Sequence, residues 1–185
     1  MRKNRIAFLI SHGTDTMAWG LSYLTYALED CPAPVALVGA QLPMTERFSS
    51  SDGYPNIELA MDTLMEICEP AVFLSFDSGR KLFTVTAWKH DKWDPDAFVG
   101  HVITHRDSNR MIHQHKLKRQ GRPLDRLFLI RTGGTIEAGL QEAADGTEYL
   151  SNRGVKQDVV NAYIEKEYCR KKRVLDEVID VPFPH

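Results

Sequence analysis

The sequence predicts an α/β domain of the three-layer, doubly wound kind, with a mostly parallel sheet like those of Rossmann and flavodoxin folds. Short apolar runs such as Ile6 to Ile10 and Val35 to Val38 are typical of strands buried on both faces. These runs alternate with longer stretches of helical periodicity. Strand, loop and helix in repetition is the pattern of a parallel α/β sheet.

The first predicted strand ends at Ile10, and the periodic apolar residues Met17, Leu21, Leu24 and Leu28 then indicate a helix that Thr14 or Asp15 would cap. Further along we expect a strand at Val35 to Val38, a loop at Thr45 to Pro55, a helix at Ile57 to Cys68, strands at Ala71 to Phe76, Lys81 to Thr86 and Leu127 to Ile130, a polar stretch at Gln141 to Asn152, a helix at Val155 to Tyr168 and a short strand at Val178 to Val181.

We expect residues 1–185 to form a single domain with a basic connecting segment at about 101–126. The net charge of -2 and the 26% of charged residues are ordinary, so they favour neither a nucleic acid nor an anionic membrane as a partner.

Cysteine usage and the N-terminal residues indicate a cytoplasmic protein. Cys31, Cys68 and Cys169 are odd in number and widely spaced, which argues against a disulfide framework and against a Cys-x-x-Cys metal site. The apolar run Ile6 to Ile10 is too short for a signal peptide or a membrane span.

Two loops that follow predicted strands are candidates for chemistry. The glycines of Thr132-Gly133-Gly134-Thr135 let the backbone adopt positive φ and approach a ligand closely, so that a hydroxyl is presented at the edge of the sheet. The same residues also suit an ordinary tight turn. A phosphate cradle is a third interpretation, but the spacing is neither that of a Walker A loop nor that of GxGxxG.

The other loop, His12-Gly13-Thr14-Asp15-Thr16, follows a strand and opens a helix. Backbone N–H groups at such a position can hold an anion or a developing oxyanion, and Asp15 could receive an ammonium group. The alternative is a helix cap with no further role. Ligand sites in parallel sheets lie at the carboxyl ends of strands, where both loops are expected.

A threonine hydroxyl needs a base before it becomes a nucleophile, because it is so weakly acidic. Lys89 and Tyr149 are candidates for that relay, although either residue taken alone is more often a surface lysine or a half-buried tyrosine.

The connecting segment carries four histidines, His101, His105, His113 and His115, at spacings that zinc could use. No carboxylate or cysteine pattern supports a metal there, and no stacking platform supports RNA binding.

Together, Thr-Gly-Gly-Thr-Ile after one strand and His-Gly-Thr-Asp-Thr-Met after another resemble the L-asparaginase/glutaminase family of bacterial type. The segment Pro34 to Pro43 and the Ser51-Asp52-Gly53 loop resemble the same family, as does Lys89, nine residues before Phe98. Tyr149 resembles the tyrosine of the family's active-site flap. The resemblance covers most of the chain but only about half of a family member, since the C-terminal domain has no counterpart.

The resemblance implies amide hydrolysis that releases ammonia through an acyl-threonine ester. Thr135 would be the nucleophile, polarised or deprotonated by Tyr149. Thr14 would be a second catalytic threonine, with Lys89 and Asp15 as its relay.

The implied substrate is a small amino-acid amide such as L-asparagine or glutamine. The implied substrate-binding positions are Asp15, Gly13, Gly134 and Ala40, with Asp15 on the α-ammonium group and the backbone at Thr14 and Ala40 around the side-chain amide. Neither a metal nor an organic cofactor is implied.

Besides lacking a counterpart of the C-terminal domain, the chain departs from the family in two ways. The Thr-Gly-Gly-Thr strand begins the family's chain but here follows the lysine segment, so we expect a circularly permuted N-terminal domain. The short motif that binds the substrate α-carboxylate has no match after Val178 to Val181, so we expect slow hydrolysis or altered specificity.

Three alternatives stay open beside this enzyme. One is a non-catalytic amino-acid-binding module, and another is a subunit completed by a partner chain. The third is an amidotransferase subunit that supplies ammonia to tRNA-linked glutamate. Assembly as a homo-oligomer is open as well.

Overall fold

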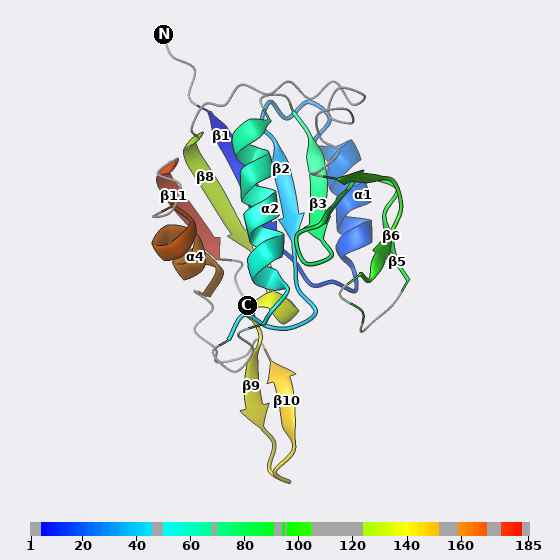
Figure 1. The fold of residues 1–185 in the computed structure, drawn as a ribbon, viewed down its shortest axis with the longest axis vertical. Helices are drawn as coiled ribbons and strands as arrows, with labels where there is room; N and C mark the ends of the chain where they lie inside the picture. Colours follow the sequence, from blue (N-terminus) through cyan, green and yellow to red (C-terminus); the bar gives the residue numbers. More distant parts are fainter. Residues whose placement is uncertain are drawn as a thin grey trace.

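A seven-stranded sheet with the order β11-β8-β1-β2-β3-β4-β7 forms the centre of the computed structural model (Figure 1). The structure describes residues 5–45, 50–67, 70–90, 94, 96–104, 124–151, 159–169 and 175–182. The strands are β1 (Ile6–Ser11), β2 (Val35–Val38), β3 (Val72–Phe76), β4 (Lys81–Phe83), β7 (Val102–Thr104), β8 (Leu124–Arg131) and β11 (Leu175–Pro182). The neighbouring strands from β11 to β3 pair in parallel. Beyond them, β4 pairs antiparallel with β3, and β7 pairs antiparallel with β4.

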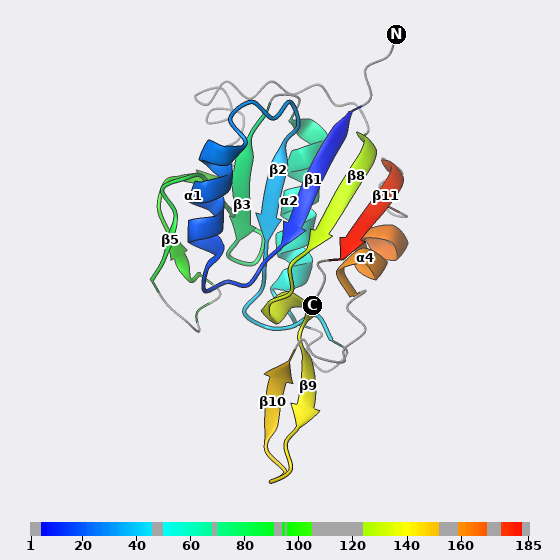
Figure 2. The same ribbon diagram turned by 180° about the vertical axis from the view of Figure 1, so that it is seen from behind.

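Helices cover both faces of the sheet. The helix α1 (Met17–Ala27) lies on one face, and α2 (Gly53–Glu66) and α4 (Val159–Tyr163) lie on the other (Figures 1 and 2). Successive side chains of a strand point to opposite faces, so Ala36 and Val38 join the core under α2, whereas Leu37 joins the core under α1. The predicted three-layer, mostly parallel α/β fold is therefore confirmed.

The two crossovers from β1 to β3 have opposite hand. Both move one strand across the sheet in the same direction, but α1 and α2 lie on opposite faces. The β2–α2–β3 connection is the left-handed one (Figure 1), an arrangement found in only about 2% of such units. The loop that leads from β2 into α2 consequently lies at the carboxyl edge on the face opposite α1.

The order of strands reverses at β1. On one side β1 pairs with β2, the next strand in the chain, through Phe8 and Val35. On the other side it pairs with the distant β8, through Phe8 and Phe128. The carboxyl ends of β1 and β8 therefore form a topological switch point, where parallel α/β sheets hold their ligands.

The start of α1 differs from the sequence-based expectation. The N-cap residue is Thr16, which makes no capping hydrogen bond through its side chain. The expectation that Thr14 or Asp15 caps the helix is therefore wrong. The physical reason is that both side chains are bound by the ammonium group of Lys89 instead.

Several other elements differ from the sequence-based expectations in their bounds or in their type. The helix α2 begins at Gly53 rather than Ile57, and the polar stretch after Gln141 contains a β-hairpin, β9 (Gly139–Glu142) and β10 (Glu148–Ser151). This hairpin projects from the carboxyl end of the sheet (Figures 1 and 2). Two further short strands, β5 (Trp88–Lys89) and β6 (Phe98–Val99), pair with each other. The predicted helix at Val155 to Tyr168 is described from Val159 on, as α4 followed by a π-helical turn, Ile164–Tyr168.

The basic connecting segment is described only at its two ends, which belong to β7 and β8. His101 lies 3.4 Å from the Thr84 hydroxyl through its Nδ1 atom. His105, His113 and His115 lie outside the described residues.

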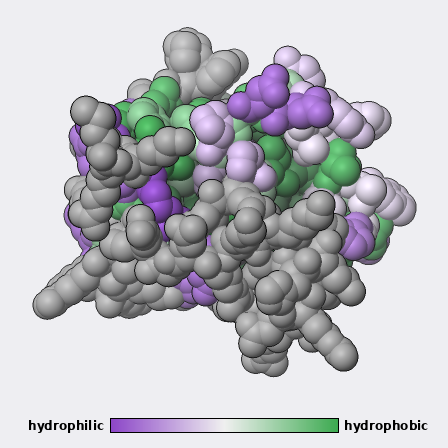
Figure 3. All heavy atoms as spheres, turned by 90° about the horizontal axis from the view of Figure 1, so that it is seen from above, coloured by the Kyte–Doolittle hydropathy of each residue, from purple (hydrophilic) through white to green (hydrophobic). Residues whose placement is uncertain are grey.

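Figure 3 views the molecule from the edge opposite the hairpin, where hydrophilic and hydrophobic side chains alternate among the described residues. Cys31 and Cys169 are free thiols, and Cys68 lies outside the described residues. None of the described helices combines the length and apolar character that crossing a membrane requires.

Arg5 joins the start of β1 to the end of α2. Its guanidinium donates hydrogen bonds to the carbonyl oxygens of Leu64, Met65 and Ile67 at 3.4, 3.2 and 2.8 Å. Carbonyls at a helix C-terminus lack partners within the helix and carry the negative end of its dipole. We expect Arg5→Met to lower the free energy of unfolding by about 2 kcal/mol, measured by urea denaturation.

Arg126→Met is the matched control, because Arg126 pairs with Glu177 while their side chains stay 48% and 52% exposed. Loss of such a surface pair should cost less than about 1 kcal/mol. Equal losses in the two variants would contradict the role given to Arg5.

Candidate active site

The two loops singled out in the sequence touch each other through glycine backbone. The parallel register of β1 and β8 sets Ser11 opposite Arg131, so both loops leave the sheet side by side. A Cβ atom on Gly134 would lie 2.5 Å from the Cα of Gly13, well inside contact distance. Gly134 also has a φ of 95°, which side-chain-bearing residues rarely adopt. Only glycine at position 134 permits this approach.

Thr135 begins a short turn directly after this contact. Residues Thr135–Glu137 form one turn of 3-10 helix, η2, in which the Glu137 N–H donates to the Gly134 carbonyl. The Met44 N–H donates to the Ile136 carbonyl, which fixes the turn to the loop before α2. The turn holds Thr135, partly buried, at the carboxyl edge of the sheet.

Thr14, Lys89 and Asp15 form a connected set of polar side chains. The Lys89 ammonium donates to the Thr14 hydroxyl oxygen at 2.7 Å and to the Asp15 carboxylate at 2.8 Å. The Lys89 side chain is only 12% exposed, whereas that of Asp15 is 72% exposed. Lys89 thus lies between a buried hydroxyl and a carboxylate that reaches solvent.

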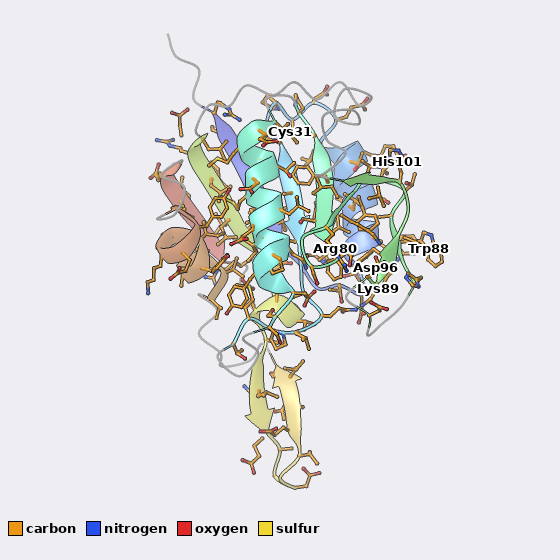
Figure 4. All side chains as sticks on the ribbon, in the orientation of Figure 1. Cys31, Arg80, Trp88, Lys89, Asp96 and His101 are labelled. Atoms are coloured by element: carbon orange, nitrogen blue, oxygen red, sulfur yellow. The ribbon has the colours of Figure 1, made fainter. Side chains whose placement is uncertain are left out.

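The strand β5 brings Lys89 to this place. Lys89 pairs with Phe98 of β6, and Phe98 is anchored in the core against Phe76 and Phe83. Figure 4 labels Lys89 and its chain neighbour Trp88. The Trp88 side chain points outward, and the residue is 59% exposed. The burial of one β6 phenylalanine therefore sets the position of the lysine amine.

Gln41 is a site residue that the sequence analysis did not single out. Its side-chain oxygen accepts a 3.4 Å hydrogen bond from the Thr14 hydroxyl. Its backbone N–H donates to the buried Asp52 carboxylate, which also accepts from the Leu42 N–H. Burial raises the pKa of Asp52, and these N–H donors act in the opposite direction. Only the distance to Thr14 in the folded chain identifies Gln41, because glutamine has no distinctive spacing here.

A cavity of about 250 Å³ opens where the loops meet. Its lining consists of Gly13, Thr14, Asp15, Thr16, Gly134, Thr135, Ala138, Leu150 and Ser151. The two threonines predicted to be catalytic thus face one cavity, with the Lys89 amine behind Thr14. A hydroxyl within hydrogen-bond reach of an amine, and the amine in contact with a carboxylate, is an arrangement able to move a proton.

Besides Lys89, two predicted site residues lie outside that lining. Tyr149 is on β10, 48% exposed, and its hydroxyl donates to the side-chain oxygen of Gln141 on β9 at 3.1 Å. Ala40 is completely buried in the core beneath α2. The neighbours Leu150 and Ser151, rather than Tyr149, bring the hairpin to the cavity, and neither was singled out in the sequence.

Within the described part of the chain, no three His, Cys, Asp or Glu side chains converge in a way that could hold a metal ion.

A protein-family model described as "Asparaginase, N-terminal" matches residues 1–116. The matched region contains Thr14, Asp15 and Lys89. Thr135 and Tyr149 lie beyond it.

Comparison with curated proteins gives relatives that this chain matches over only part of its length and of theirs. L-asparaginase 1 of Escherichia coli K12 is 46% identical over 50 residues, which is 27% of this chain and 14% of that protein. L-asparaginase of Thermococcus kodakarensis is 37% identical over 68 residues, 37% of this chain and 20% of that protein. The mouse "60 kDa lysophospholipase" is 39% identical over 71 residues, 38% of this chain and 12% of that protein. The chain therefore matches a fifth or less of the length of these relatives.

The contact between the two loops is testable with a pair of alanine substitutions. Gly134→Ala places a Cβ against the Gly13 backbone and strains a positive φ, so we expect it to lower the free energy of unfolding by about 3 kcal/mol or more. Gly146→Ala at the hairpin tip also strains a positive φ, but its nearest neighbour would be 3.9 Å away. Gly146→Ala should lower the free energy of unfolding by about 1 kcal/mol. Similar losses in Gly134→Ala and Gly146→Ala would show that the loops are not in contact.

Proposed function

The chain belongs to the asparaginase family, and on that premise we propose that it hydrolyses the side-chain amide of L-asparagine, glutamine or a related small amide to the acid and ammonia. The observation that carries the proposal is that Thr14 and Thr135 line one cavity, with Lys89 hydrogen-bonded to the Thr14 hydroxyl and to the Asp15 carboxylate. The described residues offer hydroxyl and amine groups rather than a metal cluster at that place.

In the proposed first step, the Thr135 oxygen attacks the amide carbonyl carbon, and the carbon–nitrogen bond breaks. The hydroxyl proton passes to the leaving nitrogen, which departs as ammonia and leaves an acyl-threonine ester. Tyr149 is the proposed proton carrier for this step. In the structure the Tyr149 hydroxyl is hydrogen-bonded to Gln141. The hairpin must therefore turn Tyr149 toward the cavity before Tyr149 can carry this proton.

In the proposed second step, water attacks the ester, and the Thr135 oxygen leaves with a proton. The Thr14 hydroxyl is proposed to take the proton of that water and to pass its own proton to the Lys89 nitrogen, 2.7 Å away, when that nitrogen is a neutral amine. The Asp15 carboxylate accepts a hydrogen bond from the Lys89 nitrogen at 2.8 Å, so it lies next to the proton that this step moves.

The size and charge of the cavity support an amino-acid substrate. A volume of about 250 Å³ is smaller than the pockets that hold drug-sized ligands. The Asp15 side chain is 72% exposed and lines the cavity, so it presents a carboxylate to a substrate ammonium group while it binds Lys89. Gly13 and Gly134 add backbone close to the position proposed for the amide. Ala40, buried beneath α2, would act through backbone alone.

A second candidate is hydrolysis of a carboxylic ester, because the same acyl-threonine chemistry cleaves esters and a mouse relative is named a lysophospholipase. The apolar side chain of Leu150, 45% exposed, lies at the cavity and favours a substrate with an apolar part.

We also propose that the domain is a circular permutation of the family's N-terminal domain. The support is that β8 and β11 join the sheet beside β1, although they follow β7 in the chain. A chain with residues 124–182 placed before residue 5 needs a crossover of a dozen or more residues between β11 and β1, because parallel strands cannot be joined by a tight turn. Such a chain should keep the Phe8–Phe128 pairing, detected by cross-strand NMR contacts. Loss of that pairing would oppose the proposal.

Three substitutions test the hydrolysis itself. We expect Thr135→Ala to lower kcat/KM for asparagine by about a thousandfold or more, and Thr14→Ala and Lys89→Met to lower it by roughly a hundredfold or more. Ammonia release from asparagine and glutamine, and fatty-acid release from a lysophospholipid, are the measurements. Thr25→Ala is the control and should leave the rate unchanged, since the Thr25 hydroxyl donates to the Leu21 carbonyl within α1.

Activity that survives both threonine substitutions would overturn the assignment. If no substrate is turned over, calorimetry with asparagine and aspartate decides between a binding module and a subunit that needs a partner chain. Binding without turnover supports the first, and binding only after a partner is added supports the second. Fatty acid released without ammonia would favour the ester candidate.

A further inference from the structure

Glu137 is a buried carboxyl group directly behind the proposed nucleophile. It is the last residue of the η2 turn that begins at Thr135, and it is only 1% exposed. Neither of its carboxyl oxygens has a hydrogen-bond partner among the described residues. The hydroxyl of Ser11 at the end of β1 is completely buried and likewise lacks a partner.

The surroundings of Glu137 favour its neutral form. Burial raises the pKa of the carboxyl group, and this outweighs the opposing effects of the Ser11 hydroxyl, the Arg131 guanidinium and the Gly133 N–H. The guanidinium of Arg131 binds both carboxylate oxygens of Asp180, at 2.8 and 2.9 Å. The negative charge of Asp180 raises the Glu137 pKa further. Arg131 and Asp180 are the charged groups that act on Glu137.

A buried carboxylate without partners is far costlier than a buried carboxylic acid, because an ion loses more solvation energy than a neutral group. The acid also has an O–H that it can donate to the Ser11 oxygen, for which the described residues offer no other partner. A neutral Glu137 and Ser11 can therefore satisfy each other across the gap between η2 and β1.

We infer that Glu137 is a positioning residue for Thr135, and that its buried carboxyl group, in the neutral form, holds the η2 turn against the end of β1. A 3-10 helix has three residues per turn, so the Thr135 and Glu137 side chains point about 120° apart. Thr135 lines the cavity, whereas Glu137 is buried in the interior. Fixing Glu137 in the interior therefore fixes the direction of the Thr135 hydroxyl.

The consequence for pH follows from the sign of the pKa shift. Below the usual glutamate pKa of 4.5 the group is protonated in both the folded and the unfolded chain. As the pH rises above that value, the unfolded chain releases its proton first, so the free energy of unfolding falls until the folded chain is ionised as well. Above the folded pKa the carboxylate loosens the turn, and Thr135 becomes less well placed.

The inference rests on the proposed function only in treating Thr135 as the nucleophile. Its test therefore begins with a measurement that needs no activity. In the full chain, the carboxyl 13C resonance of Glu137 and the methyl resonance of Thr135 are followed by NMR from pH 4 to pH 9. We expect both to titrate with one midpoint, above 4.5. In Glu137→Gln the Thr135 methyl should lose that titration, and in Glu29→Gln, which alters an exposed glutamate, it should keep it.

Activity gives a second, separate outcome. We expect the wild-type kcat to fall by about tenfold as the pH rises through that midpoint, and we expect Glu137→Gln to lack this fall because its amide cannot ionise. The inference would be overturned if the Thr135 methyl resonance does not change with the Glu137 midpoint. It would also be overturned if kcat has the same pH profile in the wild type and in Glu137→Gln. If no amide is hydrolysed at any pH, the proposed function fails while the NMR titration still decides the inference.

Discussion

The parallel pairing of β1 with β8 is the constraint on which the rest of the structure depends. Its register sets Ser11 opposite Arg131, and both candidate loops leave the sheet from these two residues. The contact between Gly13 and Gly134 is possible only in this register, because a shift of one residue would turn every side chain of the strand to the other face. Leu9 of β1 and Leu127 and Leu129 of β8 are fully buried in the core under α2, so neither strand has that freedom.

The rest of the candidate site is assembled around that pairing from elements with other tasks. Lys89 is placed by the burial of Phe98, and Gln41 by the carboxylate of Asp52 in the loop that enters the left-handed crossover. Thr14 lies between them and binds both. The polar groups of the cavity are therefore held by core packing and backbone hydrogen bonds on two sides, and by the glycine contact on the third. The geometry of such a site is therefore sensitive to substitution of residues that do not line the cavity.

The sequence predicted those parts of the fold that follow from local patterns. Apolar runs identified the buried strands, and two glycine-containing loops after strands identified the edge where Thr14 and Thr135 meet. The hand of the β2–α2–β3 crossover was not predictable, because it depends on which face α2 covers and not on its own residues. Glu137 was missed for a similar reason. A glutamate two residues after a nucleophile loop is ordinary in sequence, and only its burial beside Ser11 distinguishes it.

The distance along the chain between β1 and β8 also bears on how the protein folds. Arg5 and Asp125, which are hydrogen-bonded at the start of the two strands, are 120 residues apart. Closing so long a loop costs entropy before any contact compensates for it, so pairings of this kind form late. The units β1–α1–β2 and β2–α2–β3 involve far shorter loops and can form first. An early intermediate would then contain Thr14 but present β1 as an open sheet edge, a surface prone to pair with other chains. The yield of competent protein in the cell would depend on how quickly β8 covers that edge.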